Sequence, residues 1–136
     1  MKKITLIIEK GSDDELWGRV AYDDNLITSN ASTLDLLQKK IRDILHKLHD
    51  LAPNDIEFDL VYDLTAVFSE KKYLNLSEVA QKIGINRSLM AQYAAGKKFP
   101  SLERAKEIEK AIHVLGRDLL KIKIAVKGIR AKKKNG

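Results

Sequence analysis

The chain contains no cysteine and only two prolines, Pro53 and Pro100, among its 136 residues. The absence of cysteine excludes a disulfide framework and metal sites built on thiolates, and it fits a reducing cytosol. Long hydrophobic runs are also missing, since the longest one near the N-terminus, residues 4–8, is interrupted by Thr5. Such a run is too short for the core of a signal peptide or for a membrane span. We therefore expect a cytoplasmic protein.

Charge is distributed unevenly along a chain that is 44% hydrophobic and 32% charged, a composition typical of folded globular proteins. Residues 1–66 carry 8 Lys and Arg against 13 Asp and Glu, a net charge of −5, whereas residues 67–136 carry 17 against 6, a net charge of +11. A basic module suits a phosphate backbone because binding releases condensed counterions. An acidic module repels nucleic acid and can attract a basic protein. The asymmetry predicts two modules with different partners, and the alternative is a solvated surface.

Three short segments near the N-terminus have the composition of β-strands. Residues 3–9 and 15–22 are rich in β-branched and aromatic side chains that alternate loosely with polar ones, as is typical of strands. The turn-forming residues 11–14 separate them, and residues 23–25 form a second turn before a shorter strand at 26–30. The N-terminal half is therefore predicted to begin with three consecutive strands.

A helix and a fourth strand are predicted next. Ser32 is placed to cap the helix through its hydroxyl group, and Asp35 three residues later suits a variant of the capping box. The apolar side chains that follow form one stripe with helical spacing: Leu34, Leu37, Ile41, Ile44, Leu45 and Leu48. After the helix-ending segment 53–55, residues 56–64 alternate between apolar and mostly acidic side chains. The predicted order is β-β-β-α-β, a sheet with a helix packed on one face, in an α+β protein.

The hairpin, the short third strand and the segment NLITSNASTLDLL (residues 25–37) resemble HicB-type antitoxins. The resemblance implies a truncated ribonuclease-H-like domain over residues 1–65. It further implies that this domain binds and blocks a small basic ribonuclease toxin of the HicA type. In that family a glycine–cysteine pair and a further glycine commonly mark the third strand, whereas the corresponding positions here hold Asn25, Leu26, Ile27 and Asn30.

Acidic side chains on one face of the predicted fourth strand are the candidates for chemistry or docking. Ribonuclease H chemistry uses clustered carboxylates to hold metal ions, and Glu57, Asp59 and Asp63 could begin such a cluster. However, the interior of the first strand has no acid, and the other acids fall in turns, where Asp is favoured for conformational reasons. We therefore expect no enzyme and no cofactor, and we interpret this face as solvated or as a docking surface for the toxin. His46 and His49 are predicted on the polar side of the helix, without a metal.

The segment NLSEVAQKIGINRSLMAQYAAGKKFP (Asn75–Pro100) predicts a helix-turn-helix. Asn75 and Glu78 form the capping pattern of its first helix, which a helix over residues 65–73 precedes. Gly84 can adopt positive φ and end that helix, and Asn86 can cap the next one. The apolar residues predicted to form the core of this module are Val67, Phe68, Leu74, Leu76, Val79, Ala80, Ile83, Met90, Tyr93, Leu102, Ala105, Ile108, Ile112 and Leu115.

This pattern resembles the Xre/Cro-type helix-turn-helix of phage repressors and antitoxins over residues 66–116. The matching residues are Val79, Ala80, Ile83, Gly84, Ile85, Asn86, Met90, Tyr93, Gly96 and Pro100. The resemblance implies a recognition helix at residues 87–95 that enters the major groove, where Arg prefers guanine and Gln prefers adenine. Its outward positions are Arg87, Ser88, Ala91 and Gln92. The residues implied against the phosphate backbone are Asn75, Ser77, Lys97 and Lys98, together with the amides that begin the helix after Asn75.

Pro100 and Ser101 start a last helix, and residues 117–126 either extend it or form a terminal strand. We expect the sheet domain at residues 1–65, the DNA-binding domain at 66–126 and a basic disordered tail at 127–136. Because one helix-turn-helix contacts only a short stretch of double-stranded DNA, a homodimer or a tetramer is predicted. The two resemblances together imply a type II antitoxin that neutralises its toxin and represses its own operon.

Two alternatives remain open at this point. The first is a DNA-binding transcriptional regulator without a toxin, whose N-terminal domain dimerises or senses a ligand. The second is a metal-dependent nuclease, which would require catalytic carboxylates.

Overall fold

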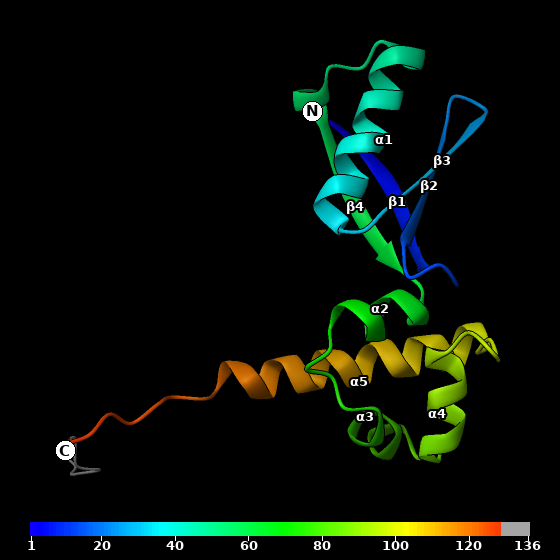
Figure 1. The fold of residues 1–136 in the computed structure, drawn as a ribbon. Coiled ribbons are helices and arrows are strands. Elements are labelled where there is room, and N and C mark those ends of the chain that lie inside the picture. The colour runs from blue at the N-terminus through cyan, green and yellow to red at the C-terminus, as the bar shows by residue number, and fades with distance from the viewer. Residues whose placement is uncertain (129–136) are drawn as a thin grey trace.

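The computed structural model describes residues 1–128, and these residues form an α+β protein with a four-stranded mixed sheet and five α-helices (Figure 1). The strands are β1 (Lys2–Lys10), β2 (Leu16–Tyr22), β3 (Asn25–Ala31) and β4 (Ile56–Tyr62). The helices are α1 (Leu34–His49), α2 (Leu64–Glu70), α3 (Leu76–Ile83), α4 (Arg87–Ala94) and α5 (Leu102–Leu120), with a short 3-10 turn at Pro53–Asp55. The predicted α+β class and the β-β-β-α-β order are confirmed. Of the tail predicted at residues 127–136, residues 129–136 lie outside the described part of the chain.

The sheet has the strand order β3-β2-β1-β4. The antiparallel pairs β1–β2 and β2–β3 follow from the two tight turns, while β4 lies parallel to β1 and requires the crossover through α1. Every second residue of β1 and β2 faces α1, so Leu6, Ile8 and Val20 are buried against Leu37 and Ile41. Burial of each such side chain stabilises the fold by about 1.5–3 kcal/mol.

Helix α1 begins one residue later than predicted. Thr33, and not Ser32, is its N-cap: the Thr33 hydroxyl accepts a hydrogen bond of 3.2 Å from the Leu36 amide. Serine and threonine can both cap a helix, so the position of the cap depends on where β3 ends, at Ala31.

The last turn of α1 also differs from the predicted apolar stripe. Leu48 is 67% exposed, whereas the side chain of His49 is largely buried and its ring lies edge-on to the Tyr22 ring at 5.0 Å. The prediction that His49 lies on the polar side is therefore wrong. Tyr22 ends β2 beside this turn of the helix, and its ring packs against the histidine instead of Leu48.

The helical module has a separate core. Val79 and Ala80 of α3 and Met90 of α4 are buried against Ile108 of α5. Leu102 was predicted to join this core but is 74% exposed, because it is the first residue of α5 and precedes the part of the helix that packs. Of the two alternatives for residues 117–126, the structure shows the helix extension as far as Leu120, where α5 ends, and residues 122–126 form no strand.

Helix α2 belongs to both cores. Ala66 is fully buried with the sheet, while Leu64 and Phe68 pack against the helical core. The predicted boundary between residues 65 and 66 therefore falls inside α2. Within residues 1–128, no helix is both long enough and apolar enough to cross a membrane.

Candidate nucleic-acid interface

Helices α3 and α4 are each fixed at their N-terminus by an asparagine. The Asn75 Oδ1 atom accepts hydrogen bonds from the amides of Ser77 (2.8 Å) and Glu78 (3.3 Å). The Asn86 Oδ1 atom accepts one of 2.8 Å from the Leu89 amide. Both predicted caps are confirmed, and each contributes about 1 kcal/mol to the stability of its helix.

The turn between the two helices depends on Gly84. Its φ of +76° lies in the left-handed region, which a side chain would make strained. The Ile85 amide then donates a 3.1 Å hydrogen bond to the Ala80 carbonyl, which closes the end of α3. Ile85 packs partly buried against the helical core. The angle between α3 and α4 is therefore set by local bonds as well as by packing.

Helix α4 presents its first turn to solvent. Arg87 and Ser88 are exposed, whereas Ala91 and Gln92 are half-buried, and Met90 and Tyr93 on the other side of the helix enter the core. The four predicted base-reading positions thus share one side of α4. Arg87 and Ser88, next to the Asn86 cap, are the more exposed of the four.

The segment after α4 turns back on the helix. Gly96 has a φ of +75°, and the amides of Lys97 and Lys98 both donate to the Gln92 carbonyl, at 2.9 and 3.3 Å. Both lysine side chains are exposed. Two cations therefore stand at a defined place beyond the C-terminal end of α4.

The predicted phosphate contacts at α3 need one correction. The amides of Ser77 and Glu78 cannot be open phosphate donors, because both already donate to Asn75 Oδ1. Asn75 and Ser77 are exposed, so the Asn75 side-chain amide and the Ser77 hydroxyl can still donate to a phosphate at this helix end.

The acidic face predicted on the fourth strand is smaller than expected. Glu57 and Asp59 are exposed on β4, opposite Lys3 and Thr5 of β1. The prediction that Asp63 shares this face is wrong, because β4 ends at Tyr62 and Asp63 is the N-cap of α2. Within residues 1–128, no three His, Asp or Glu side chains lie close enough together to hold a metal ion.

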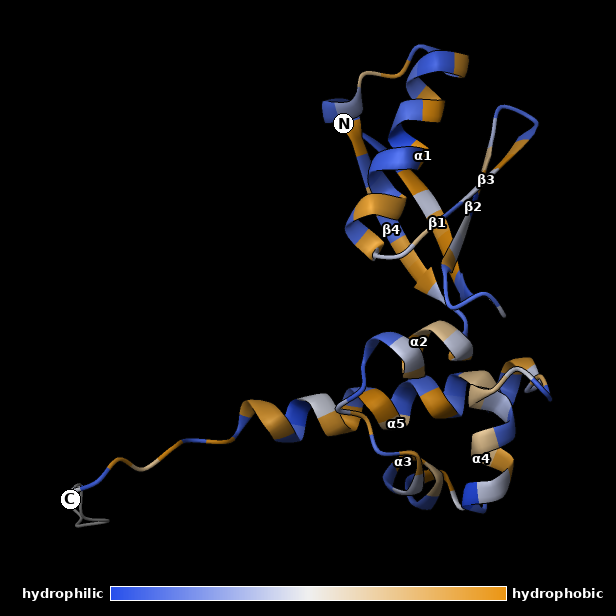
Figure 2. Ribbon diagram, viewed as in Figure 1, coloured by the Kyte–Doolittle hydropathy of each residue, from blue (hydrophilic) through white to orange (hydrophobic). Residues whose placement is uncertain are grey.

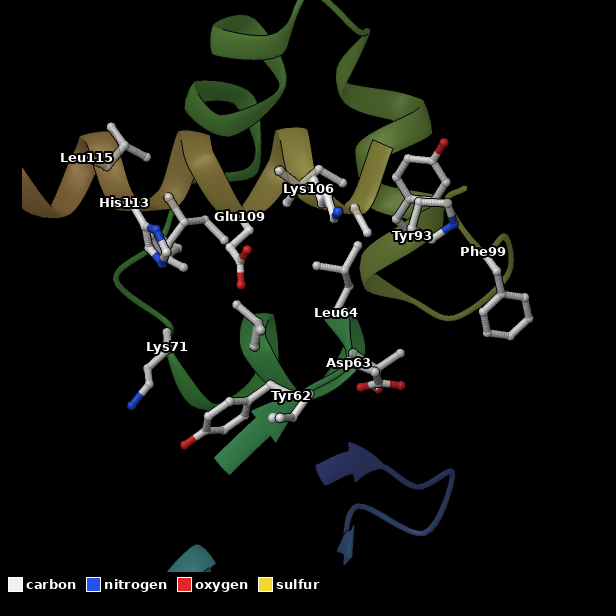
Figure 3. A pocket seen from close by; sticks show the side chains of 18 of the residues that line it. Tyr62, Asp63, Leu64, Lys71, Tyr93, Phe99, Lys106, Glu109, His113 and Leu115 are labelled. Atoms are coloured by element: carbon white, nitrogen blue, oxygen red, sulfur yellow. Dashed lines mark hydrogen bonds between the residues drawn. The ribbon is translucent and has the colours of Figure 1, made fainter. Parts of the chain in front are cut away.

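A largely apolar cavity of about 860 Å³ lies where the sheet meets the helical module. Tyr62 and Leu64 lie on one side of it, and Lys106, Glu109 and His113 of α5 lie on the other (Figure 3). Among the described hydrogen bonds and ion pairs, none joins two of the charged side chains that line this cavity. The cavity therefore has the character of an apolar groove.

Sequence reasoning missed the junction between the two modules. Thr65 Oγ1 accepts a 3.0 Å hydrogen bond from the Lys10 amide and donates one of 2.6 Å to Asp63 Oδ1, which also accepts from the Ala66 amide at 3.0 Å. The Asp63 amide donates to the Ile8 carbonyl at 3.0 Å. The spacing of Asp63 and Thr65 after the strand could have indicated a capped helix. The bond between Thr65 and Lys10 of β1 depends on the tertiary fold and could not be read from the sequence.

Comparison with protein-family models, with curated proteins and with solved structures gives no match for this chain.

Proposed function

We propose that the chain is a transcription regulator that binds double-stranded DNA through α3 and α4. The observation that carries the proposal is the exposed first turn of α4, where Arg87 and Ser88 stand beside the Asn86 cap at the end of the Gly84 turn. A helix held in this way fits the major groove with its N-terminal residues at the base edges. Arg87 would pair with a guanine through O6 and N7, and Gln92 with an adenine.

Backbone contacts would come from both ends of the same pair of helices. Asn75 and Ser77 at the start of α3, and Lys97 and Lys98 after α4, are exposed polar groups that can donate to phosphates. The net charge of +11 over residues 67–136 supports a strong electrostatic contribution. The direct test is selection of binding sites from a random duplex library, in which an enriched sequence supports the proposal and no enrichment contradicts it.

Two copies would be needed for useful affinity, because one helix-turn-helix contacts only a few base pairs. A dimer would present two α4 helices to half-sites about 34 Å apart, or a multiple of that distance. The operator is then expected to be an inverted repeat.

The second proposed function is that of a HicB-type antitoxin, in which the sheet domain neutralises a small basic ribonuclease and α3–α4 repress the operon. Two observations favour it over a regulator without a toxin. Residues 1–66 are acidic, with a net charge of −5. The β-β-β-α-β sheet is covered by α1 on one face, and on the other face Glu57, Asp59 and the half-exposed Trp17 are open to solvent.

Co-expression with the adjacent reading frame tests this second function. We expect the neighbour alone to stop growth, and the chain to restore growth and to co-purify with it. A double variant, Glu57→Ala with Asp59→Ala, should no longer restore growth, whereas Arg87→Ala should still restore it. A neighbour without toxicity, or one that the chain does not bind, favours the regulator without a toxin. Cleavage of RNA in Mg²⁺ that Asp59→Ala abolishes would instead indicate a nuclease.

A further inference from the structure

The segment that follows α5 has the pattern of a β-strand without a partner strand. In residues 121–127 the sequence KIKIAVK places Ile122, Ile124 and Val126 on one side and lysines at 121, 123 and 127 on the other. All three apolar side chains are exposed, Ile124 by 81%. Hydrophobic residues continue along α5 to its last turn, and the following segment runs away from the sheet (Figures 1 and 2). A partner strand that buried these three side chains would therefore gain hydrophobic stabilisation.

The outer edge of β4 is available for another strand. Within residues 1–128, β4 pairs only with β1, through the parallel register that runs from Ile56 to Tyr62. The Asp63 amide donates to the Ile8 carbonyl, so the odd-numbered residues of β4 direct their backbone groups toward β1 and the even-numbered ones toward the outer edge. The Ile56 carbonyl there accepts from Arg42 Nη2 at 3.4 Å. The backbone groups of Phe58 and Leu60 remain for an added strand.

The two faces of β4 differ in the same way as the two sides of the segment. Phe58, Leu60 and Tyr62 lie on the face that α1 covers, but they are only partly buried because α1 packs mainly over β3 and β2. Glu57 and Asp59 lie on the opposite, open face and are exposed. An added strand with apolar side chains on one side and lysines on the other would complete both faces.

We propose that residues 121–127 of one copy of this chain add as an antiparallel strand to the outer edge of β4 in a second copy. A register with Lys123 opposite Asp59 places Ile122 beside Leu60 and Ile124 beside Phe58. The apolar side chains then cover the half-buried edge of the core, and the lysine meets the carboxylate on the open face. Main-chain hydrogen bonds to Phe58 and Leu60 supply the pairing itself.

A second copy is the occupant because the segment of the same copy leaves α5 in a direction away from the sheet (Figure 1). The antiparallel direction brings the start of the incoming strand to the C-terminal end of β4. The cavity of about 860 Å³ is lined there by Leu60, Val61 and Tyr62, so it leaves room for the preceding helical turn of the partner.

The other free edge of the sheet is less suitable. The exposed residues of β3 on the open face are Leu26 and Thr28, with the half-buried Asn30 next to them, and none of them is acidic. An added basic strand would therefore find no opposite charge there. The Asn30 carbonyl also accepts from Lys40 Nζ at 2.9 Å, which occupies one of the groups at that edge.

Engineered disulfides test the pairing cleanly, since the natural chain has no cysteine. Asp59 and Lys123 would form a pair that is not hydrogen-bonded, whose Cα atoms lie about 4.5 Å apart, within the range that a disulfide spans. The single variants Asp59→Cys and Lys123→Cys are mixed and oxidised mildly, and Thr28→Cys mixed with Lys123→Cys is the control. A dimer linked between positions 59 and 123 and absent from the control supports the proposal. Equal linkage in both mixtures, or no linkage in either, overturns it.

Self-association gives a second measurement, made without DNA so that its outcome does not depend on the proposed function. Ile124→Asp should raise the Kd of the dimer about tenfold or more, because a charge would enter the half-buried edge. Ile124→Val keeps the apolar side and should leave the Kd nearly unchanged. Ile124 is exposed in the single chain, so both variants should fold. An unchanged Kd for Ile124→Asp, or a protein that stays monomeric at high concentration, contradicts the proposed strand exchange.

Discussion

The hydroxyl oxygen of Thr65 accepts a 3.0 Å hydrogen bond from the backbone amide of Lys10, which joins the first helix of the helical module to the end of β1. The same hydroxyl donates to the Asp63 carboxylate that caps α2. One side chain thus connects the sheet, the helix cap and the helical module. We therefore expect the two modules to unfold more cooperatively than two modules joined by a flexible linker.

Thr65→Val is expected to lower the free energy of unfolding by about 1–3 kcal/mol, because the partly buried Lys10 amide loses its acceptor. Urea denaturation followed by circular dichroism measures the change. The matched control is Thr28→Val, at an exposed position of β3, which should change the stability little. Equal effects of the two substitutions would contradict the role of this bond.

Gly18→Ala is expected to destabilise the sheet domain by about 1–3 kcal/mol through overpacking. A Cβ atom at Gly18 would lie 3.0 Å from both Leu6 Cδ1 and Leu37 Cδ2. Gly116→Ala is the control, since a Cβ there meets nothing within 4 Å and alanine is the better helix former. Thermal unfolding should show a lower Tm for the first variant and an equal or higher Tm for the second. The opposite order would mean that α1 packs differently on β2.

Arg87→Ala is expected to cost about 1–3 kcal/mol of binding free energy at the preferred DNA site and to relax the preference at one base pair. Fluorescence anisotropy with the preferred duplex and single-base variants measures both effects. Arg117→Ala removes the same charge from an exposed position on α5 and is the control. If the two variants lose the same affinity, Arg87 contributes only charge.

Lys97→Ala is expected to weaken binding to all duplexes alike. Removing one phosphate contact should reduce the slope of log K against log salt by about 0.9. Titrations at several salt concentrations, with the preferred duplex and an unrelated one, give that slope. A loss confined to the preferred sequence would show that Lys97 contacts a base and not the backbone.

Helices α3 and α4 and the turn between them could be predicted closely because their signals are local. Asn75, Gly84 and Asn86 act through bonds to residues within four positions along the chain, so their spacing is visible in the sequence. The alternating apolar residues of the strands were likewise enough to place the four strands along the chain, since one face of the sheet had to be buried.

The errors concern choices that tertiary packing decides. Ser32 and Thr33 both carry a hydroxyl group that can cap a helix, and the end of β3 selects Thr33. The period-2 pattern continues past Tyr62 to Leu64, but Asp63 caps α2 and Leu64 packs in the helical core. Leu48 and His49 exchange their expected environments because Tyr22 happens to lie beside the last turn of α1. Each of these outcomes depends on contacts between separate elements, so the local sequence does not determine it.

The central claim is that α3 and α4 read duplex DNA, and selection from a random duplex library tests it most directly. The purified full-length chain and its Arg87→Ala variant would be carried through the same rounds of selection and sequencing. We expect the unmodified chain to enrich an inverted repeat whose half-sites are centred roughly 10–10.5 base pairs apart, or a multiple. We expect the variant to lose the preference at one symmetric pair of positions. A pool that stays random for the unmodified chain, or an enriched site that Arg87→Ala reads equally well, would contradict the claim.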